Sequence, residues 1–222
     1  MASGLNSRAP ACSLRPPLGL SGIAMPTLRR LRLMPAALLL ALAACSSPPP
    51  RPTFPDIRFT SEPPIRLAVA SLDVRDDYRP PFKAPNVDHL FPEPPMRAAD
   101  DWARDRLRPT GQYGRVLFIL RNASVIETDL PKKSTGLTGA FTSEPAQRYD
   151  LTLQATVQIL DGQGLPIRTA NVETTRSQSV LEGITPNERD RTWYDMTKAA
   201  MADFDKQMET EIRNNFGIYY DQ

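Results

Sequence analysis

Histidine and cysteine are scarce in this chain of 222 residues, which contains one histidine and two cysteines. A zinc site usually takes three or four ligands from these residue types, so the composition argues against one. The single histidine, His89, would have to serve every nucleophile–base pairing, and no nucleophile-elbow motif surrounds any serine. Phosphate-binding glycine loops are also missing, because the turn at 161–164 is too short for one. The sequence therefore predicts no metal, no cofactor and no enzymatic activity.

Long basic runs are absent beyond residue 45, where the longest is the pair Lys132-Lys133. The whole chain holds 27 basic and 25 acidic residues, but five of the basic ones precede Cys45, and no acidic residue does. The remainder of the chain is therefore slightly acidic. Nucleic-acid binding leaves a basic footprint, so we expect no nucleic-acid partner.

The chain also lacks an apolar run long enough to cross a bilayer. The longest, Leu33–Ala44, has 12 residues and one proline. As a helix it would span roughly 18 Å, against a hydrocarbon core of about 30 Å. Three arginines come just before it: Arg29, Arg30 and Arg32. A short apolar core behind positive charge is the layout of a secretory signal peptide.

The run ends in Leu42-Ala43-Ala44-Cys45, which resembles the lipobox of bacterial lipoproteins. The resemblance implies that the Cys45 thiol carries diacylglycerol, that the leader is cut before it, and that the new amine is acylated. The alternatives are an ordinary cleaved signal peptide or a buried apolar helix with an incidental cysteine. We predict a signal peptide over 1–44, with Met25 as the start of a leader of conventional length. By resemblance to Gram-negative sorting, Ser46 after the cysteine favours the outer membrane.

Cleavage would leave Cys45 as the only cysteine, so no disulfide could form within one mature chain. Residues 45–64 contain seven prolines, which favours an extended tether next to the lipid. A proline-rich docking peptide is the alternative. Residues 65–220 then suffice for a single folded domain.

Within that domain the patterning predicts a β-α-β-β-β-α order. We expect a strand at 65–74 buried on both faces, a proline-rich connection at 79–95, and a helix that begins at Pro94-Pro95 and stops at Pro109 and Gly111. Alternating apolar residues then predict strands over 115–130, 148–160 and 166–180, the last with a polar composition typical of an edge. The predicted fold class is α+β, a two-layer sandwich with a mainly antiparallel sheet.

The last element is a long amphipathic helix over Pro186–Phe216. Thr185 and Glu188 form a capping-box pattern, and Gly217 is a suitable terminator. Apolar residues recur every three or four positions and predict one buried side: Trp193, Met196, Ala200, Phe204, Met208 and Ile212.

Two groups of ionisable residues could carry chemistry. His89 lies near Asp88 and Glu93, although a loop histidine packed beside Leu90 and Phe91 is the favoured interpretation. The stretch 72–80 holds three acids and two arginines, for which we expect a solvated turn with local ion pairs: Asp73, Asp76, Asp77, Arg75 and Arg79. A hydrolase that used Asp73, Asp76 and His89 is the enzymatic alternative.

The segment 131–147 contains lysines beside isolated apolar residues in glycine-containing sequence. We predict that Lys132, Lys133, Leu137 and Phe141 form a loop that contacts a partner or lipid headgroups. Alternatively, Leu137 and Phe141 fold back over the sheet edge.

The lipobox, the proline-rich tether and one α+β domain together resemble the small envelope lipoproteins of Gram-negative bacteria. The layout is similar to the auxiliary lipoproteins of ABC-type lipid transporters, and more distantly to the lipoprotein partner in lipopolysaccharide assembly. The resemblance implies a non-enzymatic accessory or adaptor, held to the membrane by acylated Cys45 and bound to an envelope protein, with lipid transport as the process. The alternative is a lipid- or glycan-binding module with a cavity between its helices and sheet.

Overall fold

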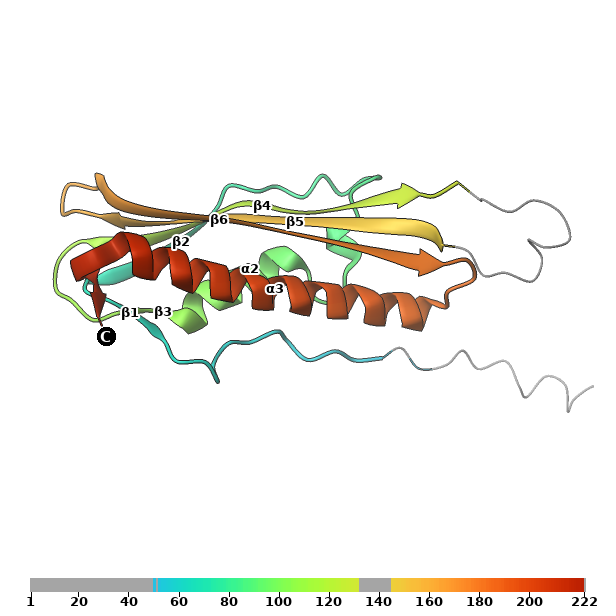
Figure 1. The fold of residues 1–222 in the computed structure, drawn as a ribbon, viewed down its shortest axis with the longest axis horizontal. Coiled ribbons are helices and arrows are strands. Elements are labelled where there is room, and N and C mark those ends of the chain that lie inside the picture. The colour runs from blue at the N-terminus through green and yellow to red at the C-terminus, as the bar shows by residue number, and fades with distance from the viewer. Residues whose placement is uncertain (1–49, 51, 132–144, 222) are drawn as a thin grey trace, which may run out of the picture. The chain divides into compact units, whose positions relative to one another are not determined.

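The computed structural model describes residues 50, 52–131 and 145–221. The chain divides into two compact units, 1–49 and 50–222, and all described residues belong to the second. This unit is an α+β fold with one four-stranded sheet, one three-stranded sheet, one short α-helix and one long α-helix (Figure 1). The predicted fold class is confirmed.

The four-stranded sheet has the order β2-β4-β5-β6. Its strands are Ser71–Asp76, Arg115–Asp129, Pro145–Leu160 and Pro166–Leu181. β2 and β4 run parallel and are joined through helix α2 (Pro95–Arg106), while β4, β5 and β6 form an antiparallel meander. The predicted β-α-β-β-β-α order is thus present.

The prediction of one strand over 65–74 is wrong, because the chain divides there between two sheets. β1 (Ile65–Leu67) pairs with β3 (Leu107–Pro109) and β7 (Tyr220–Asp221), and only β2 joins the large sheet. Gly111 packs against the break: a Cβ there would lie 2.5 Å from the Ala68 carbonyl carbon. The alternation of apolar residues also changes phase, from Leu67 and Val69 to Leu72 and Val74. Nor is β2 buried on both faces, since its residues are alternately exposed and half-buried.

Helix α2 ends at Arg106, before the predicted stop, because Leu107 pairs with Ile65 as a strand residue. Short 3₁₀ turns occupy Asp88–Leu90 (η2) and Gly217–Tyr219 (η3).

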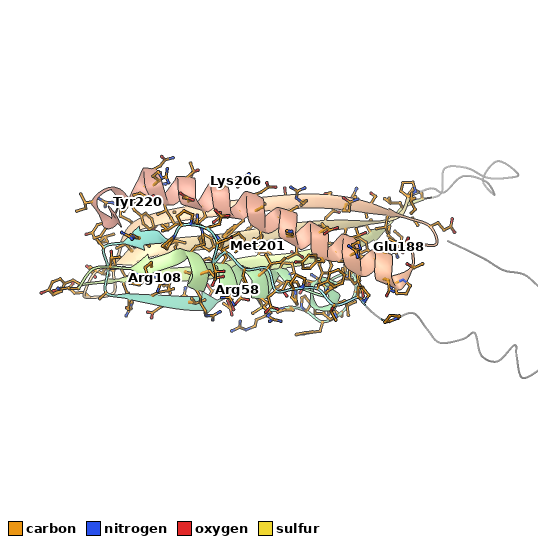
Figure 2. All side chains as sticks on the ribbon, turned by 90° about the horizontal axis from the view of Figure 1, so that it is seen from below. Arg58, Arg108, Glu188, Met201, Lys206 and Tyr220 are labelled. Atoms are coloured by element: carbon orange, nitrogen blue, oxygen red, sulfur yellow. The ribbon has the colours of Figure 1, made fainter. Side chains whose placement is uncertain are left out.

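Helix α3 has the predicted bounds, Pro186–Phe216. The Thr185 hydroxyl accepts from the Glu188 amide at 3.3 Å, and the Glu188 carboxylate accepts from the Thr185 amide at 3.0 Å, which confirms the capping box. Figure 2 labels Glu188 in the first turn and Tyr220 just beyond the last. Gly217 follows the helix with a φ of 53°, a conformation that glycine adopts without strain.

Both helices cover the same face of the large sheet, with α3 along β6 and α2 over β4 (Figure 1). The space between them is filled by fully buried side chains of the sheet and helices, which form the core: Trp102, Val116, Phe118, Leu120, Leu151, Leu153, Val157, Met201, Phe204, Met208 and Ile212.

The two edges of this sheet differ. Beyond the end of β2, residues 85–87 run along β4: the Val87 amide donates to the Val125 carbonyl, and the Glu127 amide to the Pro85 carbonyl, each at 2.9 Å. At the other edge lies β6, 16 residues long, and in the described ranges no strand pairs with its outer side. The sequence prediction that this strand forms an edge is confirmed.

The proline-rich segment before β1 is extended and packs on the domain. Ile57 and Phe59 are buried in the core, and the Phe54 ring stacks on Tyr194 with centroids 4.9 Å apart. The Arg58 Nε donates to the Asp105 carboxylate of α2 at 2.8 Å. Residues 54–59, termed the strap below, are therefore held against the domain. Only the residues before the strap remain as a candidate spacer to a lipid anchor.

Candidate functional site

A surface groove of about 530 Å³ lies between α2 and the proline-rich connection that follows β2. Apolar side chains from both segments line it: Pro80, Phe82, Pro94, Pro95 and Met96. The connection is fixed in place because residues 85–87 are hydrogen-bonded to β4 and Asp88–Leu90 form a 3₁₀ turn. Both walls of the groove therefore rest on ordered secondary structure.

Carboxyl groups with incomplete hydrogen bonding gather at this groove. Asp88 is 3% exposed and lines the groove, yet its Oδ1 has no partner in the described chain. The same holds for Oδ1 of Asp100, which lines the groove from α2, and for Oδ1 of Asp76 at the end of β2. Burial first, and then the neighbouring carboxyl of Asp76, raise the pKa of Asp100 to about 6.

Burial also raises the pKa values of two further ionisable side chains, Tyr78 and Glu93. Burial, and next the charge of Asp88, raise the pKa of the Tyr78 hydroxyl. Burial also raises the pKa of Glu93, which is 3% exposed, although the nearby Arg97 works in the opposite direction. The Arg97 Nε lies 3.9 Å from Glu93 Oε1, which is too far for a hydrogen bond.

The structure places His89 at the groove, but in a different setting from the expected one. Its ring faces Phe82, with centroids 5.2 Å apart, while Leu90 is exposed and Phe91 stacks on Trp193. Nδ1 of His89 is buried without a partner in the ordered segments. The loop position is as expected, but the expected packing beside Leu90 and Phe91 is wrong, because Phe91 points into the core.

The acidic stretch after the first strand forms ion pairs, as expected. Asp77 pairs with Arg75 at 3.0 Å and with Arg121 at 2.6 Å, and Asp73 lies 3.4 Å from Arg115. The Arg79 guanidinium donates to the Asp76 carbonyl at 2.8 Å.

The carboxyls of this stretch do not act together. Asp73 pairs in the sheet with Leu117 on one face, whereas Asp76 pairs with the core residue Leu120 on the other. Asp73 and Asp76 therefore point to opposite faces and do not form a carboxylate pair.

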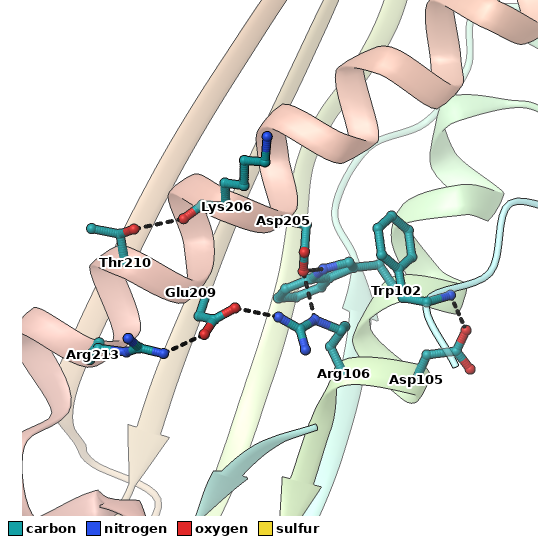
Figure 3. Close-up of polar contacts among 9 residues, drawn as sticks. Trp102, Asp105, Arg106, Asp205, Lys206, Glu209, Thr210 and Arg213 are labelled. Atoms are coloured by element: carbon teal, nitrogen blue, oxygen red, sulfur yellow. Dashed lines mark hydrogen bonds and ion pairs between the residues drawn. The ribbon is translucent and has the colours of Figure 1, made fainter. Parts of the chain in front are cut away.

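A second polar cluster lies between α2 and α3, and none of its buried side-chain atoms lacks a hydrogen-bond partner (Figure 3). Asp205 Oδ1 accepts from Trp102 Nε1 at 2.7 Å and from Arg106 Nε at 2.6 Å. Arg106 is 1% exposed and also donates to Glu209, which in turn accepts from Arg213. This cluster joins the two helices and leaves no buried polar atom unpaired, so we interpret it as structural.

Sequence reasoning missed Asp100, Phe82 and the Arg106 cluster. Asp100 was assigned only to a helix, and nothing in the local pattern distinguishes it from the neighbouring Asp101. The predicted site residues Cys45, Lys132, Lys133, Leu137 and Phe141 lie outside the described residues.

Within the described ranges, no group of three or more His, Cys, Asp or Glu side chains is arranged to hold a metal ion. The helices in those ranges are also too short or too polar to span a bilayer.

No protein-family model matches the sequence, and no curated protein matches it. Among solved structures, a minor lipoprotein from Acinetobacter baumannii is 15% identical with a TM-score of 0.37, over 66% of this chain and 92% of that one. Rare lipoprotein B from Shewanella oneidensis is 14% identical with a TM-score of 0.31, over 65% of this chain and 98% of that one. TM-scores this low do not establish a shared fold, so neither structure supports a function for this chain.

Proposed function

We propose that this protein is a lipid-anchored, non-enzymatic adaptor of a bacterial cell envelope, facing the periplasm, with the outer membrane as its site and lipid transport as its process. The anchor is the acylated Cys45. Its support is the sequence alone: Leu42–Cys45 follows a short apolar run behind three arginines, and Ser46 follows the cysteine. Three acyl chains exceed the two membrane signals that stable anchoring needs.

The observation that carries the adaptor function is the open edge of β6. A 16-residue edge strand presents unpaired backbone N–H and C=O groups, and an extended segment of a partner can add to it as a further strand. Exposed polar side chains alternate with buried ones along residues 170–175, and the strand carries the charged residues Arg168, Glu173 and Arg176. Such charges oppose pairing with an arbitrary strand and therefore favour one complementary partner.

The covered face of the sheet supports the same interpretation. Because α2 and α3 fill the inner face with buried side chains, a partner has no access there. Arg176 of β6 is also tied to Asp203 of α3 at 2.6 Å, which fixes the strand to its helix. A rigid edge costs less conformational entropy on docking than a mobile one.

Anchoring is tested by metabolic labelling with radioactive palmitate, in the native chain and in Cys45→Ala. We expect label and membrane association in the native chain only. Cys12→Ala is the matched control, because Cys12 lies in the part that cleavage would remove. An unlabelled native chain that stays in the aqueous fraction would contradict the anchor.

Docking is tested by a photocrosslinker placed at Thr175, an exposed residue of β6, and at Lys198, an exposed residue of α3, as the control. We expect the crosslinker at Thr175 to capture one defined envelope protein and the crosslinker at Lys198 to capture none. Crosslinkers at Leu137 and Phe141 test the predicted contact loop in the same way. If the Thr175 products match those of Lys198, the edge is not a docking surface.

A further inference from the structure

We propose that the groove between α2 and the connection after β2 binds a neutral, hydroxyl-rich ligand, namely a short saccharide, through Asp88, Asp100 and the ring of Phe82. The groove is formed by the connection that follows β2, at one edge of the four-stranded sheet. The proposed docking strand, β6, forms the other edge. The inference therefore goes beyond the adaptor function and does not depend on it.

Unused acceptors give the first reason. Oδ1 of Asp88 and Oδ1 of Asp100 line the groove without a well-aligned donor in the described chain, although the Tyr78 hydroxyl lies near Asp88 and the Asp76 carboxyl near Asp100. A buried carboxylate oxygen without a donor is costly, so a ligand that brings hydrogen-bond donors is favoured there. His89 Nδ1, buried and unpartnered at the same wall, adds a third polar atom.

Side chains of both charges line the groove, and this mixed lining bears on the class of ligand. Arg104 lies 3.9 Å from Asp100 Oδ2, beyond hydrogen-bond distance, and makes no hydrogen bond within the described ranges. Arg97 also lines the groove, as do the carboxylates of Asp88, Asp100 and Asp101, so a cationic ligand meets like charge as well as opposite charge. A phosphate would be repelled by the carboxylates. A hydroxyl both donates and accepts and carries no charge, so this mixed lining favours a neutral polyol.

An exposed aromatic ring gives the third reason. Phe82 is 70% exposed and lines the groove, with a φ of 54° that is uncommon for a residue other than glycine. Its ring is held beside that of His89 instead of being buried. The apolar face of a sugar ring packs on such a surface, and a groove of about 530 Å³ lies within the range of small-ligand sites.

The single histidine allows a direct test, because His89 gives one imidazole Cε1–H signal in the proton NMR spectrum. The full chain is prepared in lauryldimethylamine oxide, a detergent without sugar groups, at fixed pH. The probes are maltose and N,N′-diacetylchitobiose, with putrescine and inorganic phosphate as the charged alternatives. We expect a saturable shift of the histidine signal with at least one disaccharide, and none with putrescine or phosphate.

Two variants connect the shift to the groove. Asp88→Asn removes the buried acceptor charge, and Phe82→Ala removes the exposed ring with no core contact at risk. Each substitution should lower the affinity for the disaccharide by about tenfold, which is the loss expected for one hydrogen bond to a charged group or one aromatic contact. Glu173→Gln, at an exposed carboxylate of β6, is the matched control and should leave the affinity unchanged.

The proposal is overturned if neither disaccharide shifts the signal, if putrescine or phosphate shifts it as strongly, or if Phe82→Ala binds as tightly as the native chain. None of these results affects the crosslinks expected from Thr175. Failure of the saccharide site and failure of the docking edge are therefore distinguishable.

Discussion

Helix α2 contributes to two clusters of buried polar side chains, and only one of them has its hydrogen bonds completed. Toward α3, Arg106 is held by Asp205 and Glu209, and Asp205 also accepts from Trp102. Toward the groove, Asp100 and the neighbouring Asp88 each keep a buried oxygen without a partner. Arg106 and Asp100 lie on the same short helix, so their difference does not come from a difference in local backbone structure.

The difference separates a structural role from a binding role. Most buried polar groups in folded proteins have a hydrogen-bond partner, and exceptions are common at functional sites. A complete network such as that of Arg106 fixes how two helices pack. An incomplete hydrogen-bond network lowers the free energy of unfolding, and binding sites are often less stable for this reason. The predictions below test whether the two clusters differ in this way.

Arg106→Met should give the largest effect. It removes the donor to Asp205 and Glu209 and leaves the mostly buried Asp205 carboxylate without its cation. Breaking a buried ion pair on one side costs about 3 to 5 kcal/mol, which we expect as the loss in free energy of unfolding from denaturant titration. Arg213→Met is the control, because Arg213 is exposed and pairs with the same Glu209. If Arg106→Met lost no more free energy of unfolding than Arg213→Met, the Arg106 cluster would not be the stabilising network proposed here.

Asp100→Asn should act in the opposite direction. The pKa of Asp100 is about 6 in the folded protein, above its ordinary value of 3.8. The folded state therefore holds this proton more tightly than the unfolded chain does, so stability falls as the pH rises from about 4 to about 6 and stays at the lower level above that.

Asparagine cannot ionise, so the variant should lose that pH dependence and gain about 1 to 2 kcal/mol at neutral pH. Denaturant unfolding across the acid range measures both effects. Asp101→Asn, at the next position of α2, should keep the native slope. A native-like slope in Asp100→Asn would mean that this carboxyl does not carry the effect.

Local sequence patterns predicted much of the framework. The capping box of Thr185 and Glu188 and the recurrence of apolar residues are short-range signals, so they located α3 to the residue. Alternation likewise located β4, β5 and β6. The break after Leu67 was missed because branched apolar residues continue through it, and only the change of phase before Leu72 marks it.

The two polar clusters could not be predicted, because both depend on tertiary contacts. Arg106 and Asp205 are 99 residues apart in the chain. Asp88 and Asp100 belong to different segments, and their surroundings exist only after residues 85–87 have paired with β4. The sequence marks His89 because it is the only histidine, whereas nothing in the sequence around Asp100 distinguishes it from an exposed helix carboxylate.

The smallest expected effect concerns a third polar contact of α2, which holds the strap. Asp105 accepts hydrogen bonds from Arg58 and from the Phe59 amide of the strap. The hydrogen bond from Arg58, together with that amide and the arginine charge, lowers the pKa of Asp105 below its ordinary value. Its contribution is therefore complete above about pH 4 and is lost as the pH falls through the lowered value.

Asp105→Ala should release the strap without unfolding the domain, because the Ile57 and Phe59 contacts remain. Trypsin cleavage after Arg58 under native conditions measures the release, and a loss of about 1 kcal/mol in local opening would speed it by roughly fivefold. Asp101→Ala, on the same helix, should leave cleavage at the native rate. If Asp105→Ala were cleaved no faster, the apolar contacts of Ile57 and Phe59 alone would hold the strap.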